Sequence, residues 1–75
     1  MYIWEVIEVS PYDEIFWQVL IKDDDSTLEK IKEVILKNLE CSWEEDNIRN
    51  LKIIDDYFEI DKGSTTIEVT KKEVV

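Results

Sequence analysis

The side chains that could carry chemistry in this chain are almost all carboxylates. Its 75 residues include 19 Asp and Glu against 9 Lys and Arg, with one cysteine and no histidine. Without histidine the chain lacks the usual general base near neutral pH. The thiol of Cys41 stands beside Glu40 and near Glu44 and Glu45. Their charges disfavour a thiolate, although a helix start nearby would favour one. We therefore predict no catalytic residue and no enzyme.

A possible metal-binding loop lacks the required residues at two of its positions. Asp23, Asp25 and Thr27 match the opening of a calcium-binding loop. Such a loop then needs glycine at its sixth position and a bidentate glutamate at its twelfth. This chain has Leu28 and Val34 there. We predict no metal and no cofactor, and we interpret the acidic triplet as a solvated helix entry.

The carboxylates gather in two clusters. These are Glu44, Glu45 and Asp46, and then Asp55, Asp56, Glu59 and Asp61. On an extended strand, carboxylates two positions apart stand about 6.8 Å from each other on one face. Such an array suits a cationic groove, and we predict that both clusters, together with Tyr57, bind a partner. The alternative is an ordinary acidic surface that keeps the chain soluble.

Aromatic side chains make up 11% of the chain, more than a core of this size is expected to hold. Surplus Trp and Tyr residues are typical anchors of protein interfaces. We predict that the side of the N-terminal hairpin carrying Trp4 and Trp17 anchors a partner. The alternative is that neighbouring side chains cover most of the rings and leave only scattered ones exposed.

Trp4 and Trp17 belong to a predicted N-terminal hairpin over residues 1–21, with a turn at Ser10–Asp13. Both faces of this hairpin are apolar. In its first strand, Tyr2, Trp4 and Val6 point one way and Ile3, Ile7 and Val9 the other. In its second, Ile15, Trp17, Val19 and Ile21 are predicted to share a face opposite Phe16 and Leu20. A half-buried antiparallel strand is apolar on one face only. The second apolar face is therefore predicted to need a partner.

The remaining elements follow from capping and turn signals. A capping box at Ser26–Glu29 and apolar residues at helical spacing predict a helix over about 27–40. A second capping box at Ser42–Glu45 predicts a short helix to about Asn50. Residues 51–60 predict a strand or a bent pair of strands, with a bulge or turn at Asp55–Asp56. Gly63 marks a turn before an alternating strand over 65–72, and the tail 72–75 is expected to fray.

The order of these elements predicts one α+β domain over residues 1–75. Two hairpins around one long helix favour an antiparallel four-stranded sheet with the long and the short helix on one face. The strand order does not follow from the sequence.

The net charge of the chain limits the classes of molecule that it can bind. A formal charge of −10 repels nucleic acid and anionic lipid, because nucleic-acid affinity depends on cations that replace counterions. The charge favours a basic protein partner and fast electrostatic encounter. No apolar run approaches the length of a membrane-spanning helix, about 20 residues. We expect a cytoplasmic protein with no direct nucleic-acid or membrane contact.

In size, charge and aromatic content the chain resembles phage-encoded DNA mimics such as anti-restriction, anti-CRISPR and uracil-DNA glycosylase inhibitor proteins. The resemblance lies in composition, so no residue role is transferred. It implies a small acidic inhibitor that occupies the cationic site of a nuclease or other nucleic-acid enzyme, in the cytoplasm of the host cell. The competing hypothesis is a structural or assembly module that homodimerises through the apolar outer face of the N-terminal hairpin. A third hypothesis, a small-ligand binder using the aromatic face, lacks a supporting polar constellation.

Overall fold

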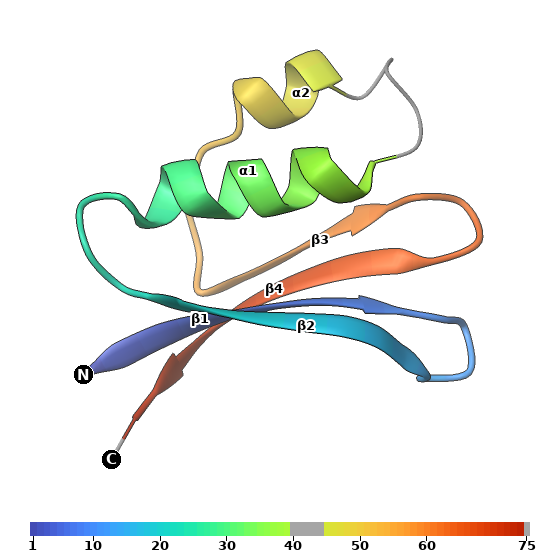
Figure 1. Ribbon diagram of the computed structural model, residues 1–75, viewed down its shortest axis with the longest axis horizontal. Coiled ribbons are helices and arrows are strands. Elements are labelled where there is room, and N and C mark those ends of the chain that lie inside the picture. Colours follow the sequence, from blue (N-terminus) through green and yellow to red (C-terminus); the bar gives the residue numbers. More distant parts are fainter. Residues whose placement is uncertain (40–44, 75) are drawn as a thin grey trace.

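The computed structural model describes residues 1–39 and 45–74, which form one antiparallel sheet and two helices on one side of it (Figure 1). The elements in chain order are β1 (Tyr2–Val9), β2 (Ile15–Lys22), α1 (Thr27–Asn38), α2 (Glu45–Arg49), β3 (Tyr57–Asp61) and β4 (Thr66–Glu73). The predicted α+β fold is confirmed. In the described part of the chain, neither helix is long and apolar enough to cross a membrane.

The strand order is β2-β1-β4-β3, so pairing of β1 with β4 joins the two hairpins into one sheet. This pairing runs from Tyr2 opposite Glu73 to Val9 opposite Thr66. It brings the two chain ends side by side, where the Val74 amide donates to the Met1 carbonyl oxygen at 2.8 Å. The expectation that the tail frays from residue 72 is wrong, because β1 holds the backbone as far as Val74.

The core lies between the sheet and α1. The sheet contributes Trp4, Val6, Ile21, Ile67 and Val69, while the helices contribute Ile31, Ile35 and Ile48. Helix α2 packs against α1 on the side away from the sheet (Figure 1). Its buried Ile48 is its contribution to the core, as expected for so short a helix.

A β-bulge at the end of β2 changes the predicted alternation. Glu8 lies opposite Trp17, but the next residue, Val9, lies opposite Ile15, so Phe16 is an extra residue in β2. Directly opposed residues share a face of the sheet. Ile15 therefore lies on the face of Val9 and not, as predicted, on that of Trp17. It is 57% exposed.

Helix α1 begins differently from the prediction. Ser26 occupies the N-cap position but makes no side-chain capping bond. Its amide and hydroxyl both donate to Asp24 Oδ1, at 2.8 and 2.7 Å. The buried Thr27 hydroxyl instead accepts from the Asp24 amide and donates to the Lys22 carbonyl oxygen. The first capping box is therefore wrong, although the helix is confirmed, and most of the second box lies outside the described residues.

The segment after α2 forms a strand only in its second half. Leu51 to Ile54 have no regular structure, Asp55 and Asp56 form a bend, and β3 begins at Tyr57. The chain bends at the acidic pair, where a bulge or turn was predicted, and the predicted strand or bent pair of strands over 51–60 is found only from Tyr57 onwards. Gly63 turns the chain into β4 with φ of 97°, a conformation that glycine adopts at little cost.

Candidate functional site

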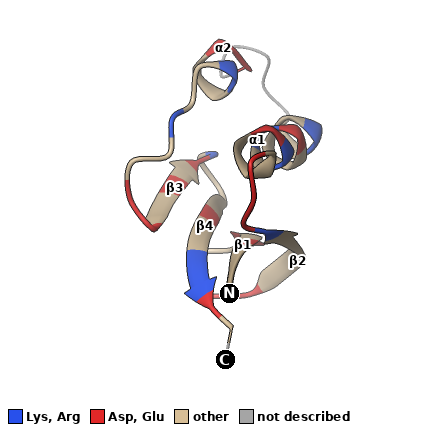
Figure 2. Cartoon of the chain, turned by 90° about the vertical axis from the view of Figure 1, so that its left-hand side faces the viewer, with Lys and Arg blue, Asp and Glu red and all other residues tan. Residues whose placement is uncertain are grey.

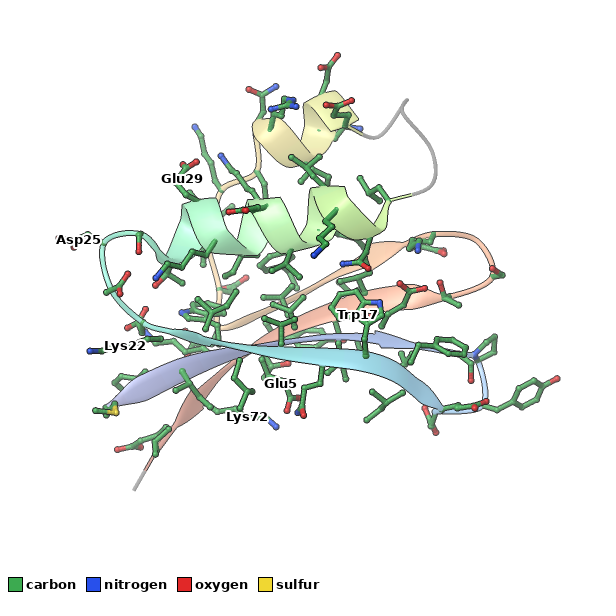
Figure 3. The ribbon with its side chains drawn as sticks, in the orientation of Figure 1. Glu5, Trp17, Lys22, Asp25, Glu29 and Lys72 are labelled. Atoms are coloured by element: carbon green, nitrogen blue, oxygen red, sulfur yellow. The ribbon has the colours of Figure 1, made fainter. Side chains whose placement is uncertain are left out.

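The side of the sheet opposite α1, here called the open face, is covered by neither helix. Because side chains alternate along each strand, it carries every second residue of the sheet. From the registers these are Ile3, Glu5, Ile7 and Val9 of β1, Ile15, Gln18, Leu20 and Lys22 of β2, Tyr57, Glu59 and Asp61 of β3, and Thr66, Glu68, Thr70 and Lys72 of β4. Figure 3 shows Glu5 and Lys72 projecting on this side, away from α1.

One half of the open face is acidic. This acidic half consists of Tyr57, Glu59, Asp61 and Glu68. Glu59 and Glu68 lie directly opposite each other on β3 and β4, and no described Lys or Arg forms an ion pair with either. Like charges directly opposite each other destabilise a sheet. A cation from another molecule placed between them would relieve this repulsion.

Tyr57 lies beside both carboxylates. Its hydroxyl is 3.0 Å from Glu59 Oε2 and 3.2 Å from Glu68 Oε1, so its single proton is donated to one or the other. The hydrogen bond to Glu59, slight burial and the nearby Glu68 charge raise the pKa of Tyr57 to about 12. The phenol therefore stays neutral at physiological pH and acts as a hydrogen-bond donor.

The other half of the open face is apolar. This apolar half consists of Ile3, Ile7, Ile15 and Leu20, with the bulged Phe16 beside them. Leu20 is 59% exposed and Phe16 53%. Between the two halves, Glu5 pairs with Lys72 at 3.1 Å and accepts a hydrogen bond from Gln18. The open face thus offers an anionic region and an apolar region separated by a neutralised pair.

The two predicted tryptophan anchors do not lie on this face. Trp4 is 3% exposed in the core, and its indole Nε1 donates to Asp23 Oδ1 at 3.0 Å. Trp17 is half-buried on the helix side, where its Nε1 donates to Glu8 Oε1 (Figure 3). We predicted that the Trp4–Trp17 side anchors a partner, but in the isolated chain this side faces α1. The helix covers that side, and the opposite side carries the exposed apolar residues.

Glu8 is a buried carboxylate that sequence analysis did not single out. Its oxygens accept hydrogen bonds from Trp17 Nε1, Lys62 Nζ and Thr65 Oγ1. Burial raises the pKa of Glu8, but the bonds from Thr65, Lys62 and Trp17 outweigh this effect, so the pKa lies below its ordinary value. Lys62 also donates to the Asn38 carbonyl oxygen at the end of α1. Every partner is internal, so this cluster ties β1 and β2 to the β3–β4 turn and to α1.

The predicted acidic clusters lie in different places. Glu45 and Asp46 are on α2, in the outer helical layer, and Glu45 pairs with Arg49; Glu44 lies outside the described residues. Asp55 and Asp56 are exposed at the bend before β3, which Figure 2 shows next to the acidic strand. No single surface joins all of the predicted partner-binding residues. Tyr57, Glu59 and Asp61 are brought together on the open face, where they meet Glu68.

Sequence analysis missed Glu68 as a site residue. The alternation of residues 65–72 placed it on the outer side of its strand, but its meeting with Glu59 depends on the register of β3 with β4. A shallow depression beside α1, lined by Glu29, Lys32, Glu33, Leu36 and Arg49, has mixed charge and holds no convergent catalytic groups. Within residues 1–39 and 45–74, no group of three or more Asp, Glu, Cys or His side chains is arranged to hold a metal ion.

Comparison of the chain with protein-family models, with curated proteins and with solved structures finds no match.

Proposed function

We propose that this chain is a small acidic protein-binding inhibitor that blocks a basic nucleic-acid-processing protein in the manner of a DNA mimic. The observation that carries the proposal is the opposed pair of Glu59 and Glu68 on a face that neither helix covers. The binding surface is the acidic half of the open face. Asp55 and Asp56 at the adjoining bend extend its charge.

Electrostatics favours a cationic partner at this surface. The whole chain carries a charge of −10, which attracts a basic protein over several ångströms at moderate salt. At close range the carboxylates of Glu59 and Glu68 can accept hydrogen bonds from Arg or Lys, the groups that otherwise contact nucleic-acid phosphates. The Tyr57 hydroxyl donates its proton to one of these carboxylates, so its oxygen can serve as a further acceptor for the donors of a phosphate-binding site.

The apolar half supplies the contact that charge alone does not. Exposed carboxylates mainly set the encounter rate and salt sensitivity of a complex, whereas desolvated apolar contacts slow its release. Leu20 and Phe16 are large and exposed, and Leu20 shares the open face with the acidic half. A partner that covers both halves would therefore be attracted by the carboxylates and would also bury the apolar side chains.

The first experiment identifies a partner and tests the mode of inhibition. The chain is used to capture proteins from a bacterial lysate, and each captured protein is then incubated with the chain and a labelled DNA duplex. We expect a basic nucleic-acid enzyme whose DNA binding the chain abolishes, while the chain alone gives no mobility shift. A captured protein that binds DNA and the chain simultaneously would contradict the proposal.

The second experiment uses matched charge variants. Replacing Glu59 and Glu68 by Gln removes two charges from the acidic half and should weaken binding to the captured enzyme by about 1–3 kcal/mol, with a smaller salt dependence. The control replaces Glu29 and Glu33 by Gln. These are exposed on α1, away from the open face, and form no ion pair with any described residue. Equal losses in both variants would show that only net charge matters and would overturn the assignment of the site.

A second candidate function, an assembly module that homodimerises through the outer face of the hairpin, is favoured by the exposed Ile15, Phe16 and Leu20. It predicts self-association without any partner.

A further inference from the structure

The free edge of β2 has fewer features that prevent pairing with another strand than the opposite edge of the sheet, which is formed by β3. In the described residues, β2 pairs only with β1, which leaves the backbone along its other side unpaired. The opposite edge strand, β3, has five residues and carries Glu59 and Asp61, both features that protect an edge from pairing. β2 has eight residues, IFWQVLIK, with no acidic side chain and no proline. Its own protecting features, the bulge at Phe16 and Lys22, lie near the two ends of the strand, so the edge between them is the least protected part of the sheet.

The hydrogen bonds of β1 identify which backbone groups of β2 are free. The Asp23 amide donates to the Tyr2 carbonyl oxygen, and the register places these two residues directly opposite each other. In antiparallel sheets such hydrogen-bonded pairs alternate with non-bonded ones. Trp17, Val19 and Ile21 therefore bond to β1. Gln18 and Leu20 point their N–H and C=O groups towards the free edge. Lys22 points its N–H there too, but its carbonyl oxygen already accepts a hydrogen bond from the Thr27 hydroxyl.

We propose that this edge pairs with the same edge of a second copy of the chain. The two β2 strands run antiparallel, with Leu20 of each copy opposite Leu20 of the other and Gln18 opposite Lys22. This register uses the free N–H groups of all three residues and the free carbonyl groups of Gln18 and Leu20 on both copies. The Gln18 N–H of each copy shares the Lys22 carbonyl oxygen of the other copy with Thr27. It also keeps side-chain faces matched, with Val19 opposite Ile21 on the helix side. The inference is independent of the proposed function.

Charge selects a second copy of β2 as the occupant. In a chain with 19 acidic residues, the paired span from Gln18 to Lys22 contains none, so no carboxylate of one copy faces a carboxylate of the other within it. A basic peptide would find no carboxylate here to neutralise it and is better suited to the acidic half. The span is therefore complementary to itself and not to the partner of the open face.

Neighbouring registers are less favourable. Moving the centre of symmetry from Leu20 to Gln18 brings the bulged Phe16 into the pairing, where the regular ladder is disrupted. Moving it to Lys22 places the two lysines opposite each other, which like-charge repulsion disfavours. Pairing centred on Leu20 avoids both. It joins two four-stranded sheets into one, in which the two acidic halves lie near the outer ends and stay accessible.

The test measures mass and amide exchange on the unmodified protein. Sedimentation should show a monomer–dimer equilibrium that strengthens severalfold between about 50 mM and about 500 mM NaCl, because salt screens the repulsion between two copies of charge −10. Binding to a basic partner has the opposite salt dependence, so the two proposals fail separately. In the dimer, the Gln18, Leu20 and Lys22 amides should gain protection from exchange with rising protein concentration. A monomer at every concentration and salt, or a dimer in which these amides exchange unprotected, would overturn the inference.

Two substitutions at one residue separate edge pairing from packing of the apolar face. Leu20→Pro removes the N–H that points to the free edge and leaves the bonds to β1 in place, as proline is tolerated on edge strands. We expect it to weaken dimerisation about tenfold or more. Leu20→Gln keeps that N–H and loses the apolar side chain, so it should weaken dimerisation less. Dimerisation by a folded Leu20→Pro variant at the native affinity would contradict edge pairing. If that variant fails to fold, the amide-exchange result on the native chain decides.

Discussion

Glu8 shows how one buried carboxylate determines which face of the hairpin the helix covers. Both faces of β1 are apolar, so hydrophobicity alone leaves the choice open. Glu8 lies on the same face as Trp4 and Val6, and on this side it meets Trp17, Lys62 and Thr65. On the open face it would lack these three partners. The buried polar network therefore favours the covered face, which the buried Ile67 and Val69 of β4 also share, and the partners of Glu8 lie as far away in the sequence as residues 62 and 65.

Replacing Glu8 by Gln is expected to destabilise the fold at neutral pH by about 1–3 kcal/mol, because it leaves the buried Lys62 ammonium without its counter-ion. The pKa of Glu8 is lowered in the folded state, so its contribution to stability is present above the ordinary value of 4.5 and is lost as the pH falls through the lowered pKa. Urea unfolding of both proteins should give a difference at pH 7 that shrinks at an acidic pH below the lowered pKa of Glu8. The exposed Glu14→Gln serves as a control and should change stability by less than about 0.5 kcal/mol. An equal difference at both pH values would contradict the role of the Glu8 charge.

The acidic half gives a second prediction at the scale of single residues. Because Glu59 and Glu68 both raise the pKa of Tyr57 to about 12, Glu68→Gln should bring that pKa closer to its ordinary value of 10.0. It should also stabilise the sheet by a few tenths of a kcal/mol by removing a like-charge pair. Ultraviolet titration of the tyrosines measures the first effect and urea unfolding the second. A Tyr57 titration that does not change would mean that Glu68 is not near the phenol in solution.

Among the secondary-structure elements, the sequence predicted individual helices, turns and strands better than it predicted which strands pair. Residues 28–39 carry apolar side chains at helical spacing, and α1 forms there; the glycine turn and the alternating strand β4 were equally readable. The strand order could not be predicted, because β1 pairs with β4 between residues that lie 57 to 71 positions apart in the sequence. The side chains on these strands would accommodate many registers. For the same reason the meeting of Glu59 with Glu68 could not be predicted. The bulge at Phe16 has no proline or glycine to mark it.

The start of α1 yields a prediction that reverses the sequence interpretation. Thr27 is 4% exposed, and its hydroxyl both accepts from the Asp24 amide and donates to the Lys22 carbonyl oxygen. Thr27→Ala should therefore cost about 1–2 kcal/mol, while Ser26→Ala should cost less than about 0.5 kcal/mol, since Ser26 makes no capping bond. Urea unfolding of the two variants tests this order. A larger cost for Ser26→Ala would restore the capping box as the signal that starts the helix.

At the scale of the whole molecule, the excess of negative charge acts on folding as well as on binding. The described ion pairs join lysines to Glu8, Glu5, Asp23 and Asp24, and Arg49 to Glu45, so many carboxylates remain unbalanced. Figure 2 shows acidic residues in the helical layer and in the sheet, and basic residues on both helices and near the end of β4. Self-repulsion of this kind destabilises a compact chain. The Glu8–Lys62 pair is little screened by salt because it is buried, whereas repulsion among exposed carboxylates is screened strongly.

The free energy of unfolding at pH 7 should therefore rise with salt, by about 1 kcal/mol between about 20 mM and about 500 mM NaCl. Urea unfolding at low protein concentration measures it on the monomer, which excludes a contribution from self-association. The control is the same salt series near pH 4.3, where the net charge of the chain is close to zero and the rise should largely vanish. A stability that falls with salt at pH 7 would mean that exposed pairs such as Glu5–Lys72 outweigh the repulsion. In that case the charge is organised to stabilise the fold itself, and the argument that it awaits a cationic partner loses its physical basis.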